Sequence, residues 1–99
     1  MSHHQVVLRA EAREELGEAF DWYEGRRPGL GHQFVRCVSD AIDLILTTPE
    51  AFPRVHGEVR RALVRRFPHG IFYIIEADII VVLAVFHARR DPADWKRRT

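Results

Sequence analysis

An unbroken apolar run near the C-terminal end constrains the fold most strongly. Residues 79–86 read IIVVLAVF, without a polar side chain and with five β-branched ones. The run is too short for an independent helix, and β-branched side chains favour strands. A strand that is apolar at every position is covered on both of its faces. The sequence therefore predicts a central strand, around which the other elements must pack.

The first half of the chain has the apolar spacing of two helices. Apolar residues recur every three or four positions between residues 11 and 26, and a wider apolar stripe runs from residue 30 to residue 46. The connecting segment RPGLG, residues 27–31, is short, so the two helices should be antiparallel neighbours. A stripe as wide as the second one must contact the first helix and one further element.

The second half changes to the patterns of strands. With the segment QVVL near the N-terminus, four segments are typical of strands, namely residues 5–8, 59–67, 71–76 and 79–87. Pro68 and Gly70 mark one turn, and residues 76–78 form a tight hairpin connection. We expect an α+β fold in the order β-α-α-β-β-β, in which the helical hairpin packs on one face of a twisted antiparallel sheet.

Length and cysteine content exclude several classes of protein. Ninety-nine residues make a single domain, residues 1–99, in which we expect residues 1–4 to be disordered and residues 92–99 to form a C-terminal tail or a short helix. The single cysteine, Cys37, excludes an internal disulfide, and no Cys/His spacing indicates a metal site. We find no signal peptide, and the longest apolar run is far below the ~20 residues that cross a bilayer. We therefore expect a cytoplasmic protein without cofactor, metal or membrane association.

The net charge of +1 conceals two oppositely charged halves. Residues 1–53 contain five arginines and nine acidic residues, a net charge of −4, whereas residues 54–99 contain ten basic and five acidic residues, a net charge of +5. Such a division indicates one acidic and one basic face. All basic residues except Lys96 are arginines, which suit bidentate and stacked contacts, although a GC-rich genome explains the choice equally well.

One group of basic residues lies on the strand predicted at residues 59–67. Alternation places Arg61 and Arg65 on one face of this strand and Arg60 and Arg66 on the other. By themselves such charges are typical of an edge strand protected against aggregation. A second group, with His87, Arg89 and Arg90, follows the central strand and can reach the same region.

Two activities fit such a cluster of arginines beside one imidazole. It could bind a phosphodiester and stabilise the charge that develops during cleavage, with His87 as the acid or base. It could equally dock an acidic protein surface, where Arg and Trp commonly act as anchors. In the first helix, Trp22 lies beside the apolar stripe, either over the seam between the helices or on a groove that receives a partner helix.

Five short segments in this order carry a resemblance to a known family. They are WYE (22–24), PGLGHQF (28–34), PEAFP (49–53), VRRALVRRFPHGIFY (59–73) and VFHARRDPADW (85–95). With the predicted order of elements, the chain resembles the RelE/ParE superfamily of bacterial type II toxin–antitoxin modules over nearly its whole length. It is more similar to the ParE-like, plasmid stabilisation toxins.

The resemblance implies one of two targets. RelE-like members are ribosome-dependent mRNA endoribonucleases that use basic residues on the sheet with an arginine and a tyrosine near the C-terminus, whereas ParE-like members act on DNA gyrase. Here Gly70 stands where a RelE-type nuclease carries an arginine, and Trp95 stands in place of the tyrosine. Because Trp cannot act as an acid or base, these departures favour the ParE side.

Our leading hypothesis is therefore a gyrase-inhibiting toxin whose C-terminal region contacts the target through Arg89, Arg90, Trp95, Lys96, Arg97 and Arg98. The alternative is an mRNA interferase with the catalytic set His87, Arg89, Arg61 and Arg66. A third hypothesis is an inactive member that retains only antitoxin binding.

The resemblance also implies a cognate antitoxin that neutralises the toxin. We expect an acidic, amphipathic antitoxin segment that folds on binding, because such coupled folding needs apolar surface and complementary charge. The predicted antitoxin-binding residues are Trp22, Tyr23, Arg60, Arg61 and Arg65. A homodimer or a heterotetramer with the antitoxin is compatible with this interpretation.

Overall fold

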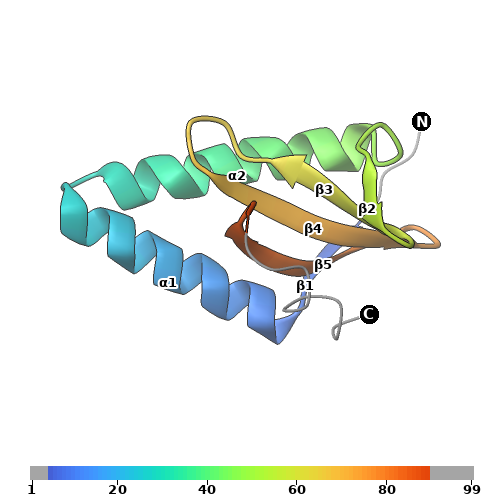
Figure 1. The fold of residues 1–99 in the computed structure, drawn as a ribbon, viewed down its shortest axis with the longest axis horizontal. Coiled ribbons are helices and arrows are strands. Elements are labelled where there is room, and N and C mark those ends of the chain that lie inside the picture. Colours follow the sequence, from blue (N-terminus) through green and yellow to red (C-terminus); the bar gives the residue numbers. More distant parts are fainter. Residues whose placement is uncertain (1–4, 90–99) are drawn as a thin grey trace.

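The computed structural model describes residues 5–89 and contains two helices and five strands (Figure 1). In chain order these are β1 (Gln5–Leu8), α1 (Ala10–Arg26), α2 (Leu30–Thr47), β2 (Arg54–His56), β3 (Val59–Leu63), β4 (His69–Glu76) and β5 (Ile79–His87). The predictions for residues 1–4 and 92–99 lie outside this range. Both helices agree with their predicted limits to within one residue.

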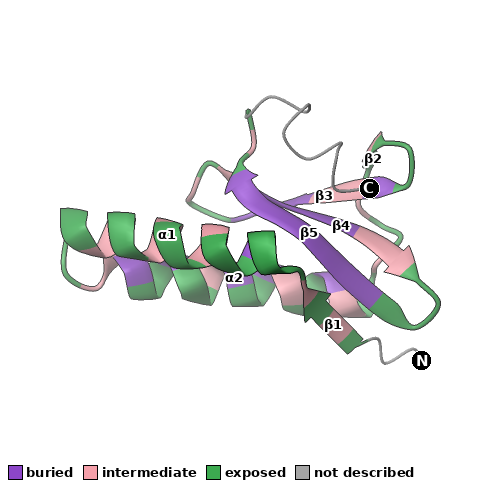
Figure 2. Ribbon diagram, turned by 90° about the horizontal axis from the view of Figure 1, so that it is seen from below, coloured by how far each residue is buried: buried purple, intermediate pink, exposed green. Residues whose placement is uncertain are grey.

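The helices and the strands form two layers. Figure 2 shows α1 and α2 side by side beneath the sheet, so that one sheet face is covered by the helical hairpin. The predicted α+β architecture is confirmed. Within residues 5–89 neither helix is both long and apolar enough to span a membrane.

The sheet is mixed: it is antiparallel as predicted except for one parallel pair. Its strand order is β1-β5-β4-β3-β2. β1 pairs in parallel with β5, from Gln5 opposite Ile79 to Leu8 opposite Val82, while the other pairs are antiparallel. β1 fills the outer edge of β5, whose backbone groups would otherwise lack a partner on that side.

Three details between residues 54 and 70 also differ from the sequence prediction. A short strand that we did not predict, β2, pairs with the start of β3, with Arg54 opposite Arg60. β3 ends at Leu63 rather than at residue 67, since Arg66 adopts a left-handed conformation (φ 70°) in the following turn. Gly70, expected in that turn, instead pairs with Leu63 inside the β3–β4 ladder.

The strand predicted from the apolar run is confirmed as buried on both faces. β5 is buried from Ile80 to Phe86, and it lies between β1 and β4. Its side chains contribute to two apolar clusters, one between the sheet and the helices and one on the opposite sheet face. A bulge at Leu83 shifts the β4–β5 register by one residue between Tyr73 and Phe72.

Candidate functional site

An aromatic cluster lies where both helices meet the turn between β3 and β4. Tyr23 of α1, Phe34 of α2, Phe67 of the turn and His69 of β4 pack with ring centroids 4.8 to 5.7 Å apart. Phe34 is fully buried, and the other three are partly exposed. The WYE and PGLGHQF segments and the β3–β4 turn therefore meet at one end of the molecule.

Trp22 extends this cluster outward onto the surface. Its ring meets Tyr23 edge-on at 5.1 Å, yet 55% of the residue remains exposed. The guanidinium of Arg26 stacks over the indole at 4.2 Å, a cation–π geometry. Of the two sequence interpretations, a Trp over the helix–helix seam would be covered, so the exposure favours a binding surface.

Trp22 lines an open hollow of about 300 Å³. Ala19 and Tyr23 of α1 form one wall with it, and the opposite wall is formed by Pro68, His69 and His87. We call these six residues the Trp22 hollow. Its surface is formed by side chains from α1, the β3–β4 turn and the end of β5, so only the folded chain assembles it.

Two histidines of the Trp22 hollow face each other across the sheet. His69 and His87 lie opposite each other in the β4–β5 ladder, with ring centroids 6.3 Å apart. Burial lowers the pKa of His69, and charge on His87 lowers it further. The Tyr23 hydroxyl lies 3.4 Å from Nδ1 of His69, and burial raises the pKa of this phenol. The site therefore favours a neutral His69 that can accept the phenolic hydrogen.

A carboxylate holds the helical hairpin closed beneath this site. Glu24 accepts hydrogen bonds from the backbone N–H groups of Gly29 (2.8 Å) and Gly31 (2.9 Å). These bonds, the Gly29 bond foremost, lower the pKa of Glu24, and they satisfy donors that the start of α2 leaves free. Gly29 itself has φ 91°, a conformation that glycine adopts without strain.

Comparisons with known proteins agree with this arrangement. The family model described as ParE toxin of type II toxin–antitoxin system, parDE, matches residues 6–92. The chain belongs to the ParE toxin family. It is accordingly a toxin-type component of a type II toxin–antitoxin system. Among curated protein sequences, none matches the chain.

Two solved structures show the same fold as this ParE-family chain. The chromosomal ParDE system from P. aeruginosa gives a TM-score of 0.76 at 15% identity, covering 86% of this chain and 96% of that one. The toxin–antitoxin complex RelBE2 from Mycobacterium tuberculosis gives a TM-score of 0.60 at 19% identity, and the match covers 85% of this chain and 96% of that one. The predicted superfamily is confirmed, and at these identities the likeness concerns the fold alone.

Arg60, one of the predicted antitoxin contacts, is engaged inside this ParE-family domain. Its Nη1 donates hydrogen bonds to the carbonyl oxygens of Glu50 (3.1 Å) and Phe52 (2.6 Å). The Tyr73 hydroxyl donates to the Pro49 carbonyl at 2.6 Å, and burial raises the pKa of Tyr73 to about 12. The PEAFP segment is thus fastened to the sheet, and Arg60 has a structural task whatever else it contacts.

Arg61 lies on the sheet face opposite the helices. A Cβ built on Gly70 would come within 3.2 Å of Cγ of Arg61, so the arginine stem lies directly over this glycine. Nε of Arg61 is buried without a hydrogen-bond partner. Arg65, beyond the end of β3, is exposed. Because Gly70 accommodates the Arg61 stem, a larger side chain at position 70 would displace it.

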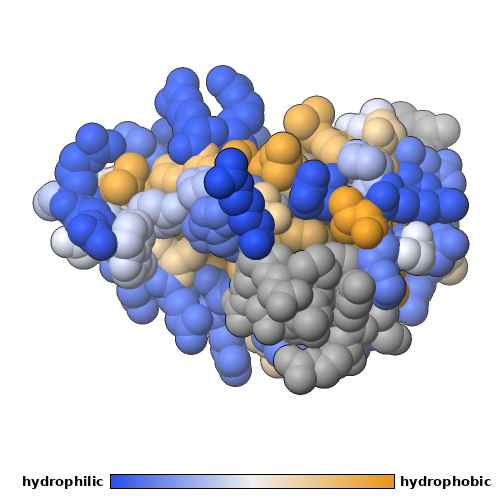
Figure 3. All heavy atoms as spheres, in the orientation of Figure 1, coloured by the Kyte–Doolittle hydropathy of each residue, from blue (hydrophilic) through white to orange (hydrophobic). Residues whose placement is uncertain are grey.

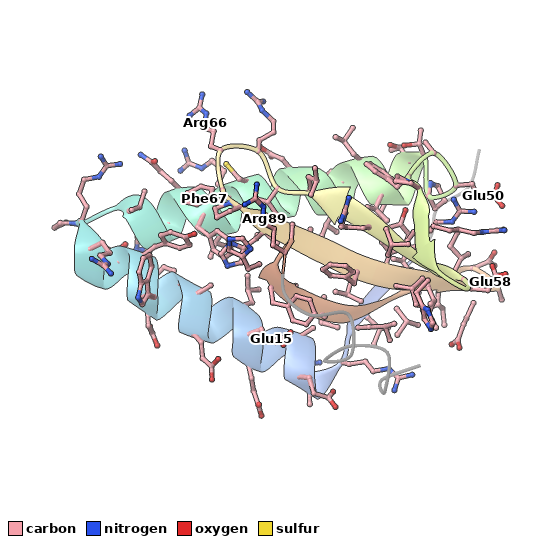
Figure 4. The ribbon with its side chains drawn as sticks, in the orientation of Figure 1. Glu15, Glu50, Glu58, Arg66, Phe67 and Arg89 are labelled. Carbon is pink, nitrogen blue, oxygen red and sulfur yellow. The ribbon has the colours of Figure 1, made fainter. Side chains whose placement is uncertain are left out.

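The four residues of the predicted nuclease set do not share one hollow. His87 and Arg89 lie together at the end of β5, where Nδ1 of His87 accepts a hydrogen bond from the Arg89 N–H at 3.1 Å. Arg61 lies on the sheet, and Arg66 lies in the β3–β4 turn against α2 (Figure 4). Of the predicted gyrase contacts, only Arg89 falls within residues 5–89; Arg90, Trp95, Lys96, Arg97 and Arg98 lie outside the described range.

Two residues of this region were missed by the sequence analysis. Neither His69 nor Glu24 was assigned a role beyond its place in a motif segment. Both could have been suspected from their neighbours, since Glu24 precedes a glycine-containing helix start and His69 borders a turn. Within residues 5–89, no group of three or more His, Cys, Asp or Glu side chains could hold a metal ion.

Proposed function

We propose that this ParE-family toxin inhibits DNA gyrase and that a cognate antitoxin neutralises it. The observation that carries the first part is the family match over residues 6–92. The geometry at Gly70 supports it. The resemblance places the arginine of a RelE-type nuclease at this position, but here the stem of Arg61 fills the space that a side chain at position 70 would need. Arg89, exposed at the end of β5, is the described residue that we assign to the gyrase contact.

Supercoiling of relaxed plasmid by purified gyrase tests this proposal. The purified toxin should block the reaction, and Arg89→Gln should weaken the block, whereas Arg13→Gln in the first turn of α1 should not. Full gyrase activity in excess toxin would overturn the gyrase assignment. Growth arrest on overexpression separates an active toxin from an inactive, antitoxin-binding member.

An mRNA interferase remains the second candidate because of the histidine pair. Two imidazoles 6.3 Å apart, one with a lowered pKa, could serve as a base and an acid at one phosphodiester. Primer extension on translated mRNA decides between the candidates. Cuts at the ribosomal A site that disappear with His87→Ala would replace the gyrase assignment with this one.

The Trp22 hollow is our proposed docking site for an antitoxin helix. Exposed Trp22 with the adjoining Tyr23 offers aromatic surface, and aromatic anchors in hollows commonly dominate binding energies. The toxin–antitoxin complexes among the structural neighbours support a partner of this kind. A more extended acidic segment would then pass near β3 and the turn that follows it, which together carry Arg60, Arg61 and Arg65.

A further inference from the structure

A second hollow lies on the other side of the β3–β4 turn. It has a volume of about 360 Å³ and is enclosed by α2, the end of α1 and the turn. Three guanidinium groups surround it, from Arg27, Arg36 and Arg66, and its apolar lining comes from Leu30, Cys37 and Phe67. We call this the arginine hollow. None of its residues belongs to the sites predicted from sequence, apart from Arg66.

The three arginines come from three separate elements. Leu30 and Cys37 lie two turns apart on a single face of α2, and Arg36 flanks this face. Arg27 follows the last residue of α1, and Arg66 is held by the β3–β4 turn. In Figure 4, Arg66 projects outward above the turn while Phe67 lies inside it, toward the centre of the molecule. The turn thus supplies both a charge and part of the apolar lining.

The positive charge of this hollow is uncompensated. Within residues 5–89, the guanidinium groups of Arg27, Arg36 and Arg66 have no hydrogen-bond or ion-pair partner. Three like charges around one hollow repel each other, and an anion placed between them would make charge-assisted hydrogen bonds to each. The hollow therefore has the chemistry of an anion-binding site.

The backbone of Arg66 provides an independent observation. Its φ of 70° is a left-handed conformation that costs free energy for any side chain with a Cβ, and glycine would adopt it without that cost. Residues held in such conformations cluster at ligand-binding positions. The turn therefore keeps an arginine beside the hollow in a conformation that glycine would adopt at lower cost.

We propose that the arginine hollow binds a glutamate or aspartate side chain of an acidic peptide, with an apolar neighbour of that residue resting on Phe67. Under the proposed function this peptide is a segment of the antitoxin, and in that respect the inference rests on that function. Phe67 and Pro68 are consecutive, and they line the arginine hollow and the Trp22 hollow respectively. One peptide that crosses the turn can therefore occupy both.

The surroundings favour a peptide over a nucleic acid. The apolar lining of Leu30 and Phe67 suits the methylene carbons of a glutamate side chain and an aliphatic neighbour of that residue. A polyanion that extended from the hollow along α1 would be repelled by the exposed carboxylates of this helix, namely Glu11, Glu14, Glu18 and Asp21. A short peptide that places single carboxylates between the arginines avoids this repulsion.

Titration of the isotope-labelled full chain, followed by NMR, tests the proposal. The probes are a short blocked peptide of glutamate and leucine, the same peptide with glutamine in place of glutamate, and inorganic phosphate. The glutamate peptide should shift the Arg27, Arg36 and Arg66 side-chain signals and the ring signals of Phe67. Arg36→Gln should weaken its binding at least about tenfold, whereas Arg13→Gln, the matched loss of one exposed charge, should not.

Three results would overturn the proposal. They are equal binding of the glutamine peptide, an equal loss with Arg13→Gln, and saturation of the same signals by phosphate at lower concentration than the peptide. Arg66→Gly separates binding from folding, since it should weaken peptide binding while unfolding occurs at the same or a higher denaturant concentration. Gyrase inhibition is measured on the same samples. A toxin that inhibits gyrase but does not bind the peptide refutes this inference alone. A toxin that binds the peptide but does not inhibit gyrase refutes only the gyrase assignment.

Discussion

At the scale of single residues, Trp22 is the most exposed large aromatic side chain of the described region that also lines a hollow. We expect Trp22→Ala to weaken antitoxin binding by about 2 kcal/mol or more, because the anchor loses its whole buried contact area. Calorimetric titration of toxin with antitoxin measures this. Leu44→Ala, which removes an equally exposed apolar side chain (57%) from α2, is the matched control. An unchanged affinity for Trp22→Ala would show that the antitoxin docks elsewhere.

His69 should make the stability of the free toxin depend on pH. Burial lowers its pKa below the ordinary 6.5, so the unfolded chain binds the proton more readily than the folded one. Stability is therefore full above about pH 6.5 and falls as the pH decreases through the lowered pKa of the folded state. Denaturant unfolding between pH 5 and pH 8 should show this slope, and His69→Phe, which keeps a ring in the cluster, should flatten it. A slope that survives His69→Phe would assign the effect to other groups.

At the scale of elements, the contact between the two helices depends on Gly31. A Cβ on this residue would lie 2.6 Å from the Phe20 carbonyl oxygen and 2.9 Å from its ring, so the helices could not remain at their present separation. We expect Gly31→Ala to lower the free energy of unfolding by roughly 1–3 kcal/mol through overpacking. Chemical denaturation measures it.

Gly17 supplies the control on the neighbouring helix. Nothing lies within 4 Å of a Cβ built there, so Gly17→Ala should gain stability, by about 0.5–1 kcal/mol, from the higher helix propensity of alanine. Destabilisation by both variants to the same extent would contradict the close approach at Gly31. The pair separates helix packing from helix propensity on one hairpin.

At the scale of the whole molecule, the separation of charge along the chain should govern the speed of antitoxin binding. The second half carries a net +5, and Figure 3 shows hydrophilic side chains projecting around apolar patches on one face. Attraction between this charge and an acidic antitoxin is screened by salt, so raising ionic strength should mainly slow association. Stopped-flow or surface-based kinetics test this. Trp22→Ala should instead speed dissociation, and a salt effect confined to dissociation would contradict the steering role.

Local features of the sequence determined the elements themselves. The apolar periods placed both helices, because a helix needs only neighbours three and four positions apart to define its buried side. The run at residues 79–86 identified the central strand for a similarly local reason, since a strand that is apolar at every position must be covered on both of its faces. The five motif segments identified the superfamily, which the family match confirms.

Tertiary structure alone decided which strands and side chains meet. Glu76 pairs with Ile79 across a two-residue turn, and a regular ladder continued from this pair would place His69 opposite Phe86. The bulge at Leu83 shifts the register by one residue, so His69 instead lies opposite His87. The parallel pairing of β1 with β5 and the two hollows beside the β3–β4 turn likewise join residues far apart in the chain. Such contacts depend on register and packing across the whole fold, which no local pattern of residues records.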